Sequence, residues 1–213
     1  MEGSLIQWFP GHMAKTRRRI REDLKLVDAV VELLDARIPL SSRNPDIKSI
    51  LGTKPTLTLL NKASLADPVV TEMWIAAIRQ ESGWAAAVDS ITGESFSKIV
   101  PTLTSMLSDK LSRWRERGMI GRKIKVMVVG IPNVGKSTFI NKLAGARKAK
   151  TEDRPGVTRD IQWVEVEKKG TGLLLLDTPG VLWPKFEDRT TGENLAITGA
   201  IRDSVFDLDS LAT

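Results

Sequence analysis

The feature that most constrains the fold is the eight-residue stretch Gly130-Ile-Pro-Asn-Val-Gly-Lys-Ser137. It satisfies the pattern G-x-x-x-x-G-K-[ST], follows the β-forming run Ile124–Val129 and precedes a helical pattern at 136–144. The two glycines let the backbone curl so that its N–H groups face phosphate oxygens, and the start of the helix adds a partial positive charge. The sequence therefore predicts a phosphate-binding loop between a strand and a helix.

The side chains of this loop fit a nucleoside triphosphate with Mg²⁺. Lys136 is expected to reach the β- and γ-phosphates, and the Ser137 hydroxyl is expected to bind the metal. Contacts to the nucleotide are also expected from Asn133, Val134, Gly135 and Thr138.

Two downstream segments are expected to complete the phosphate site. Asp177, at the end of the apolar run Leu173–Leu176, is expected to hold Mg²⁺ through water, and the Gly180 N–H is expected to face the γ-phosphate. Thr158, in Pro155–Thr158, is expected to complete the metal shell; the alternative is a simple Pro-Gly turn.

Along the whole chain, short β-rich runs alternate with longer helical patterns, which is typical of an α/β fold with a mostly parallel sheet and helices on both faces. Strands are predicted at 29–34, 56–60, 85–88, 124–129, 161–166 and 173–176. Helices are predicted at about 12–25, 43–51, 68–81, 95–115 and 136–144.

Two further strand ends carry candidate base-recognition residues. Asn61-Lys62-Ala63-Ser64 follows the strand at 56–60, and Ser90-Ile91-Thr92-Gly93 follows the strand at 85–88. P-loop GTPases read guanine with an N-K-x-D element and a later Ser-containing loop, and open α/β sheets place ligands at strand ends. Here both elements precede the phosphate loop, so the motif order is rotated relative to an ordinary GTPase.

Composition narrows the class of protein. Hydrophobic residues make up 41% and charged residues 27% of 213 residues, as in globular proteins. No apolar run approaches the roughly 20 residues of a membrane-spanning helix, and residues 1–10 do not resemble a secretory signal. The absence of cysteine excludes disulfides and thiolate metal sites. We expect a cytoplasmic protein that binds no membrane and is a monomer.

The net charge of +6 is concentrated in two clusters, near the start of the chain and between residues 110 and 125. Such clusters suit a polyanionic partner, although a solvated helix face is the competing interpretation. The candidate RNA-binding residues are Lys15, Arg17, Arg18, Arg21, Arg113, Arg117, Arg122 and Lys123.

With these residues in view, the chain resembles the circularly permuted GTPases of the YlqF/RbgA type, bacterial factors that assist assembly of the large ribosomal subunit. The resemblance covers essentially the whole chain. It is carried by Trp8–Met13, Asp35–Pro39, the phosphate loop, Pro155–Thr158 and Asp177–Pro184.

The resemblance implies GTP hydrolysis coupled to binding of ribosomal RNA in the large (50S) subunit precursor. The implied cofactors are GTP/GDP, Mg²⁺ and K⁺, with Asn133 at the position that helps hold the monovalent ion. The expected organisation is an N-terminal arm (1–26), a permuted G domain (27–190) and the start of an incomplete helical extension (191–213). Within the G domain, a basic linker (109–123) joins the base-recognition half (27–108) to the phosphate half (124–190).

The sequence departs from the family pattern at the base-reading carboxylate. Ser64 stands where N-K-x-D has Asp, and a hydroxyl accepts fewer and weaker hydrogen bonds than a carboxylate. Asp67, expected at the start of the next helix, is not expected to substitute. Asn61, Lys62 and the backbone N–H of Ile91 are left to read the base, so GTP remains the expected nucleotide.

A second departure concerns the attacking water. Val181 follows the Gly180 position, where many GTPases have a water-orienting Gln. His12, the only histidine, is a candidate to orient or deprotonate water; packing of the N-terminal arm or RNA binding is the alternative. Slow, subunit-stimulated hydrolysis is therefore expected. The competing functions are a nucleotide-gated RNA-binding module with negligible turnover and a P-loop NTPase with relaxed base specificity.

Overall fold

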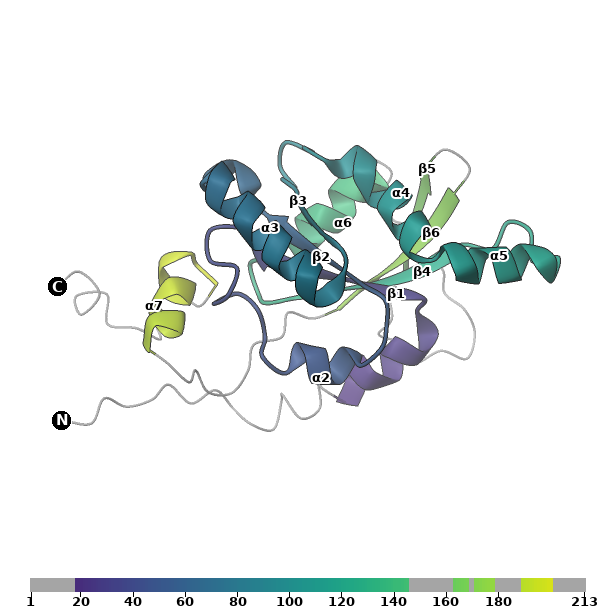
Figure 1. Ribbon diagram of the computed structural model, residues 1–213, viewed down its shortest axis with the longest axis horizontal. Helices are drawn as coiled ribbons and strands as arrows, with labels where there is room; N and C mark the ends of the chain where they lie inside the picture. Colours follow the sequence, from purple (N-terminus) through teal and green to yellow (C-terminus); the bar gives the residue numbers. More distant parts are fainter. Residues whose placement is uncertain (1–17, 146–162, 169–170, 179–188, 201–213) are drawn as a thin grey trace.

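The computed structural model describes residues 18–145, 163–168, 171–178 and 189–200. A six-stranded sheet forms its centre, in the order β3-β2-β1-β4-β6-β5 (Figure 1). Its strands are β1 (Ala29–Asp35), β2 (Thr56–Asn61), β3 (Ala85–Ala87), β4 (Ile124–Gly130), β5 (Trp163–Lys168) and β6 (Thr171–Asp177). Only the edge strand β5 runs antiparallel to its neighbour.

Helices cover both faces of the sheet. The helices are η1 (Leu24–Leu26), α2 (Ile47–Leu51), η2 (Ala63–Leu65), α3 (Pro68–Ser82), α4 (Phe96–Met106), α5 (Ser108–Glu116), α6 (Lys136–Ala144) and α7 (Arg189–Ile197). Apolar side chains of α4 and α6 pack on one face, including Phe96 against Phe139. Ile20, Leu24 and α2 pack on the other, next to a smaller cluster formed with α3. The predicted fold class is confirmed.

Because a strand's side chains alternate between the two faces, this arrangement buries both sides of the central strands. Every residue of β1 is buried, including Glu32, whose carboxylate accepts a hydrogen bond from Thr58 (3.0 Å). This explains why β1 appears in the sequence as a nearly continuous apolar run. No helix of the described ranges has both the length and the apolar character needed to cross a bilayer.

Two predicted helices differ in extent from the observed ones. The helix predicted at 43–51 begins only at Ile47, because the Asn44 side chain accepts a hydrogen bond from the Asp46 N–H (2.9 Å) and holds a turn there. The helix predicted at 95–115 is interrupted at Leu107, whose buried side chain anchors the break between α4 and α5.

The sheet brings together segments that are distant in sequence. Since β1, β2, β3, β4 and β6 are parallel, their carboxyl ends meet at one edge. The loops after these strands form the candidate nucleotide site, and α7 lies at the same end of the molecule (Figure 1). α5 lies at the opposite end.

Candidate nucleotide site

The phosphate loop connects the central strand β4 to α6, and both of its glycines are sterically required. A Cβ on Gly135 (φ 100°) would lie 2.5 Å from Asn61 Nδ2, and one on Gly130 would lie 2.7 Å from the Leu33 carbonyl oxygen. Only glycine therefore lets the loop pass this close to the neighbouring strands. Asn133, with a φ of 57°, turns the loop between them.

Lys136, the first residue of α6, folds over the loop. Its side chain is 8% exposed, and its Nζ donates to the carbonyl oxygens of Ile131 (2.9 Å) and Gly130 (3.2 Å). Burial lowers the pKa of Lys136 to about 8, and the nearby carboxylate of Asp177 opposes this shift. The lysine is held where only an anion, or these carbonyls, can compensate its charge.

Asp177 and Ser137 supply oxygen atoms near this lysine. Asp177 ends β6 beside Val128 of β4, and the Thr178 hydroxyl donates to the Val128 carbonyl (2.6 Å), which fixes the strand end. Desolvation by the surrounding chain raises the pKa of Asp177, and the charge of Lys136 opposes this rise. Ser137 and Thr138 lie in the first turn of α6 and have exposed side chains. A hydroxyl and a carboxylate are the few hard donors that Mg²⁺ needs beside phosphate oxygens and water.

The Asn61 side chain joins the two base loops to the phosphate loop. Its Nδ2 donates to the Val134 carbonyl (2.8 Å), and its Oδ1 accepts from both the Ser90 N–H (3.0 Å) and the Ser90 hydroxyl (2.8 Å). Asn61 and Ser90 are buried, and the Ala63 N–H donates to the Val88 carbonyl (3.2 Å). The three loops are thus one hydrogen-bonded unit.

Ser64 makes a contact that we did not predict. Its hydroxyl donates to Asp89 Oδ2, and Asp89 Oδ1 accepts from the N–H groups of Ile91 (2.8 Å) and Thr92 (2.9 Å). The expectation that the Ile91 N–H is available to the base is therefore wrong in this structure, because this N–H already donates a hydrogen bond to Asp89. Asp67 caps α3 by accepting from the Val70 N–H (2.9 Å), which confirms its expected place.

Asp35, at the end of β1, holds two basic side chains of the site, Arg37 and Lys62. Its carboxylate accepts two hydrogen bonds from the Arg37 guanidinium (2.7 and 2.9 Å) and pairs with Lys62 (3.0 Å). Burial would raise the pKa of Asp35, but the hydrogen bonds from Arg37 and Lys62 hold it below its usual value. Lys62 also donates to the Asn133 carbonyl (2.9 Å), so Asp35 braces the phosphate loop through this lysine.

The loop after α7 contacts the same unit. Asn133 Nδ2 donates to the Gly199 carbonyl (2.8 Å), and Asn194 Nδ2 donates to the Ser41 hydroxyl (3.0 Å). Leu195 is fully buried in the core that α4 and α6 share. The segment 189–200 is therefore packed onto the nucleotide edge of the sheet.

The candidate RNA-binding residues that the structure describes lie away from this edge. Arg18 and Arg21 are exposed on a helical segment at 18–23, and Arg113 and Arg117 are exposed on or just after α5. Arg122 lies 4.3 Å above the Trp114 ring, and Lys123 pairs with Glu165.

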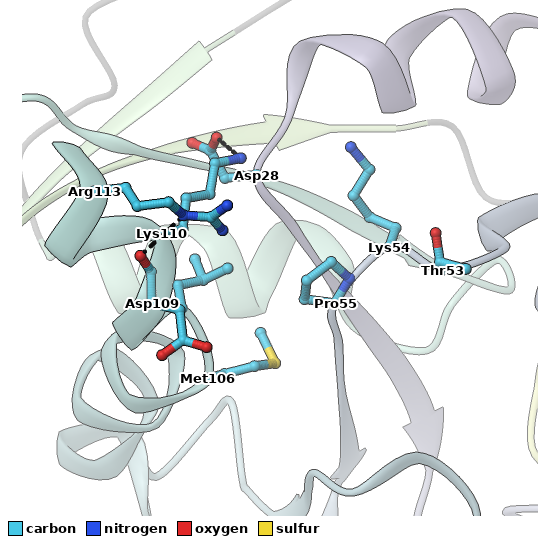
Figure 2. Close-up of a pocket in the computed structure, with 9 residues that line it drawn as sticks. Asp28, Thr53, Lys54, Pro55, Met106, Asp109, Lys110 and Arg113 are labelled. Carbon is cyan, nitrogen blue, oxygen red and sulfur yellow. Dashed lines mark hydrogen bonds and ion pairs between the residues drawn. The ribbon is translucent and has the colours of Figure 1, made fainter. Parts of the chain in front are cut away.

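A hollow of about 350 Å³ borders α5, at the end of the molecule opposite the candidate nucleotide site (Figure 2). It is lined by Lys54, Lys110 and Arg113 together with Asp28 and Asp109. Lys110 pairs with Asp28 (2.6 Å), which neutralises part of the positive charge.

The comparisons with known proteins agree with this geometry. A family model described as "50S ribosome-binding GTPase" matches residues 125–207. The chain is 53% identical over 207 residues to ribosome biogenesis GTPase A of Bacillus pumilus, covering 97% of the chain and 72% of the relative. The chain belongs to the ribosome biogenesis GTPase A family.

More distant members and a solved structure extend the likeness. Mitochondrial ribosome-associated GTPase 1 of Xenopus tropicalis is 37% identical, over 99% of the chain and 69% of its own length. GNP-bound YlqF from T. maritima matches with 29% identity and a TM-score of 0.65, over 92% of the chain and 71% of that structure. The predicted resemblance to YlqF/RbgA is confirmed.

Within this GTPase family assignment, some expected site residues lie outside the described part of the chain. They are His12, Lys15, Arg17, Thr158 and Gly180. Their roles, and the division into domains, stay predictions. α7 begins at Arg189, just before the expected boundary at 190.

Sequence reasoning missed the roles of two buried acids, Asp35 and Asp89. Asp35 was noted only as the first residue of the segment Asp35–Pro39, and Asp89 directly precedes the predicted Ser90 loop; both lie at or just after a strand end. The sequence signal that could have identified both acids is their position at the carboxyl end of a parallel strand. Their partners could not be predicted from the sequence, because each contact joins two different loops: Asp35 pairs with Lys62, and Asp89 accepts from Ser64.

Proposed function

We propose that this chain binds and hydrolyses GTP and that it assists assembly of the large ribosomal subunit. The observation that carries the nucleotide part is the joined set of loops: Asn61 connects the base loops to the phosphate loop, whose Lys136 folds over its carbonyl groups. The ribosomal part rests on membership of a family whose relatives bear ribosome-associated names.

In this proposal, the chain's own residues bind and orient the nucleotide. Lys136 exchanges its two carbonyl contacts for β- and γ-phosphate oxygens, and loop N–H groups bind the phosphates. Ser137 and Asp177 would hold Mg²⁺, which neutralises phosphate charge. Asn133, at the family's potassium position, would offer its Oδ1, since its Nδ2 already donates to Gly199.

We further propose that turnover is slow until the subunit is bound and that the partner surface includes ribosomal RNA. Val181 stands where many GTPases carry a water-orienting Gln, and exposed arginines on α5 suit phosphate contacts. His12 remains the proposed water-orienting residue.

The test measures nucleotide competition and phosphate release on the same preparation. GTP is expected to displace a fluorescent GDP at least tenfold more effectively than ATP, because a site with hydrogen-bonding groups for one base rejects another strongly. Phosphate release is expected to rise when large subunits are added. Equal displacement by ATP would refute the guanine assignment, and release that remains negligible with subunits would favour the nucleotide-gated RNA-binding module.

A further inference from the structure

Ser64 and Asp89 form a pair that bridges the two base loops. Ser64 lies on η2 after β2, whereas Asp89 follows β3. The Asp89 side chain is buried at 3% exposure, and Ser64 is exposed at the rim of the site. The serine hydroxyl donates to Asp89 Oδ2, and the Ile91 and Thr92 N–H groups donate to Oδ1.

This arrangement determines what the serine can offer a ligand. A hydroxyl has one donor hydrogen and two acceptor lone pairs. The hydrogen of Ser64 is committed to Asp89, so its oxygen can only accept a further hydrogen bond. A neighbouring carboxylate also strengthens that oxygen as an acceptor, because hydrogen bonds in a chain polarise one another.

Asp89 is held in the ionised form that this role requires. Burial alone would raise the pKa of Asp89, but hydrogen bonds from the Ser64 hydroxyl and from the N–H groups of Thr92, Ile91 and Ser64 lower it. At neutral pH the carboxylate therefore only accepts hydrogen bonds, and the direction of the Ser64 hydroxyl is fixed.

The chemistry of the bases fits an acceptor at this place. Guanine presents two donors on one edge, N1–H and the 2-amino group, whereas adenine presents an acceptor at N1, and xanthine has a carbonyl in place of the 2-amino group. In N-K-x-D elements a carboxylate at the position of Ser64 accepts from this donor edge. We propose that Asp89 replaces that carboxylate as a positioning residue for base selection, acting through the Ser64 oxygen, which accepts from the guanine 2-amino group.

This inference rests on the proposed function, since it assigns the base selectivity of the same site. The informative variant is Asp89→Asn. The amide oxygen can still accept from the Ile91 and Thr92 N–H groups, so these two contacts of the loop are retained, whereas the contact of Asp89 with the Ser64 N–H is lost. The amide NH₂ then faces Ser64 and donates to its oxygen, which turns the serine hydrogen outward and makes it a donor.

The experiment measures displacement of fluorescent GDP by GTP, XTP and ATP for the full chain and its variants. For Asp89→Asn, the affinity for GTP is expected to fall and the affinity for XTP to rise, so that the GTP:XTP affinity ratio falls roughly tenfold or more. In a Ser64→Ala background, Asp89→Asn is expected to change the ratio no further, because Asp89 acts through Ser64. Glu94→Gln, the same acid-to-amide change on an exposed residue of the loop, is the matched control and should leave the ratio unchanged.

Two results would overturn the proposal. One is an equal loss of GTP and XTP binding in Asp89→Asn, which indicates a role in loop structure alone. The other is the same ratio change with and without Ser64. If Asp89→Asn does not fold, Ser64→Ala decides by itself, since it truncates an exposed side chain and must lower the GTP:XTP ratio. If the wild-type chain binds ATP as well as GTP, the proposed function fails, whereas guanine preference with unresponsive variants refutes only the role of Asp89.

Discussion

At the scale of single residues, Lys136 places a buried positive charge in the phosphate loop. Its ammonium group is buried against two carbonyl oxygens, and burial lowers its pKa to about 8. Charged groups are costly to bury without an opposite charge. A bound triphosphate supplies that charge, so nucleotide binding should raise the pKa of Lys136 and should depend on its protonation.

The corresponding prediction concerns pH. Because Lys136 loses its proton near pH 8 in the free protein, GTP affinity is expected to be nearly constant below pH 7.5 and to fall about tenfold between pH 7 and pH 9. Titration of fluorescent GTP across this range measures the effect. In Lys136→Arg, where the guanidinium stays charged, the remaining affinity should not change with pH. Wild-type affinity that is unchanged at pH 9 would contradict the prediction.

The same shift affects folding with a defined sign. In the unfolded chain Lys136 keeps its ordinary pKa of 10.5, so between about pH 8 and 10.5 the unfolded state binds more protons than the folded state. Burial of this lysine therefore lowers the free energy of unfolding, and the full penalty applies below pH 8, where Lys136 is protonated in both states. That cost decreases as the pH rises towards 10.5.

At the scale of elements, α7 belongs to the packing of the nucleotide edge. Leu195 is fully buried, and polar contacts from Asn194 and Gly199 reach the loop after β1 and the phosphate loop. Ile197, two residues from Leu195 on the same helix, is 73% exposed. One face of α7 is thus packed onto the nucleotide edge of the sheet, and in the sequence the helix follows the Asp177–Gly180 motif.

Truncation of the buried residue tests this packing. Leu195→Ala is expected to lower the free energy of unfolding by about 2–5 kcal/mol, because it removes a buried side chain and leaves a cavity. Ile197→Ala, on the exposed face, should change it by less than about 0.5 kcal/mol. Urea unfolding followed by tryptophan fluorescence measures both. Equal effects of the two variants would show that α7 is not docked in solution.

At the scale of the whole molecule, the mostly parallel sheet separates the candidate nucleotide site from the candidate RNA-binding arginines of α5. The loops at the carboxyl ends of the strands form the candidate nucleotide site, whereas the exposed arginines of α5 lie at the other end (Figure 1). The described cations there differ in how free they are, since Arg122 stacks on Trp114 and Lys123 pairs with Glu165. At this end of the molecule, Arg113 and Arg117 are exposed candidates for contacts with RNA phosphates.

This separation predicts that RNA binding can be weakened without loss of nucleotide binding. The double variant Arg113→Ala/Arg117→Ala is expected to bind ribosomal RNA more weakly and to reduce the salt dependence, the slope of log K against log salt, by roughly 1 to 2. Its GTP affinity should be unchanged. Lys98→Ala, an exposed residue near the start of α4, serves as the control and should alter neither. A salt slope that stays the same in the double variant would remove α5 from the RNA interface.

Much of this molecule is determined by the sequence itself. The phosphate loop could be located from four fixed positions because its glycines, lysine and serine act through local geometry. The parallel strands could be predicted because buried parallel strands are nearly continuous apolar runs. The antiparallel strand β5 extends to Lys168, two residues past the predicted end at 166. The extents of two helices could not be predicted, since the turn held by Asn44 and the break at Leu107 depend on capping and burial rather than on periodicity.

The rotated motif order also came from the sequence alone, and in the structure the loop after β2, which comes first in the chain, contacts the phosphate loop after β4. Only the tertiary structure decided which side chains meet at the base loops. Ser64 looked like the loss of a carboxylate, because one sequence does not show that Asp89, 25 residues further on, lies against it. Parallel strands bring distant loops together at one edge, and their side-chain contacts depend on that packing. The sequence therefore identifies the loops of this site, and the fold assigns their partners.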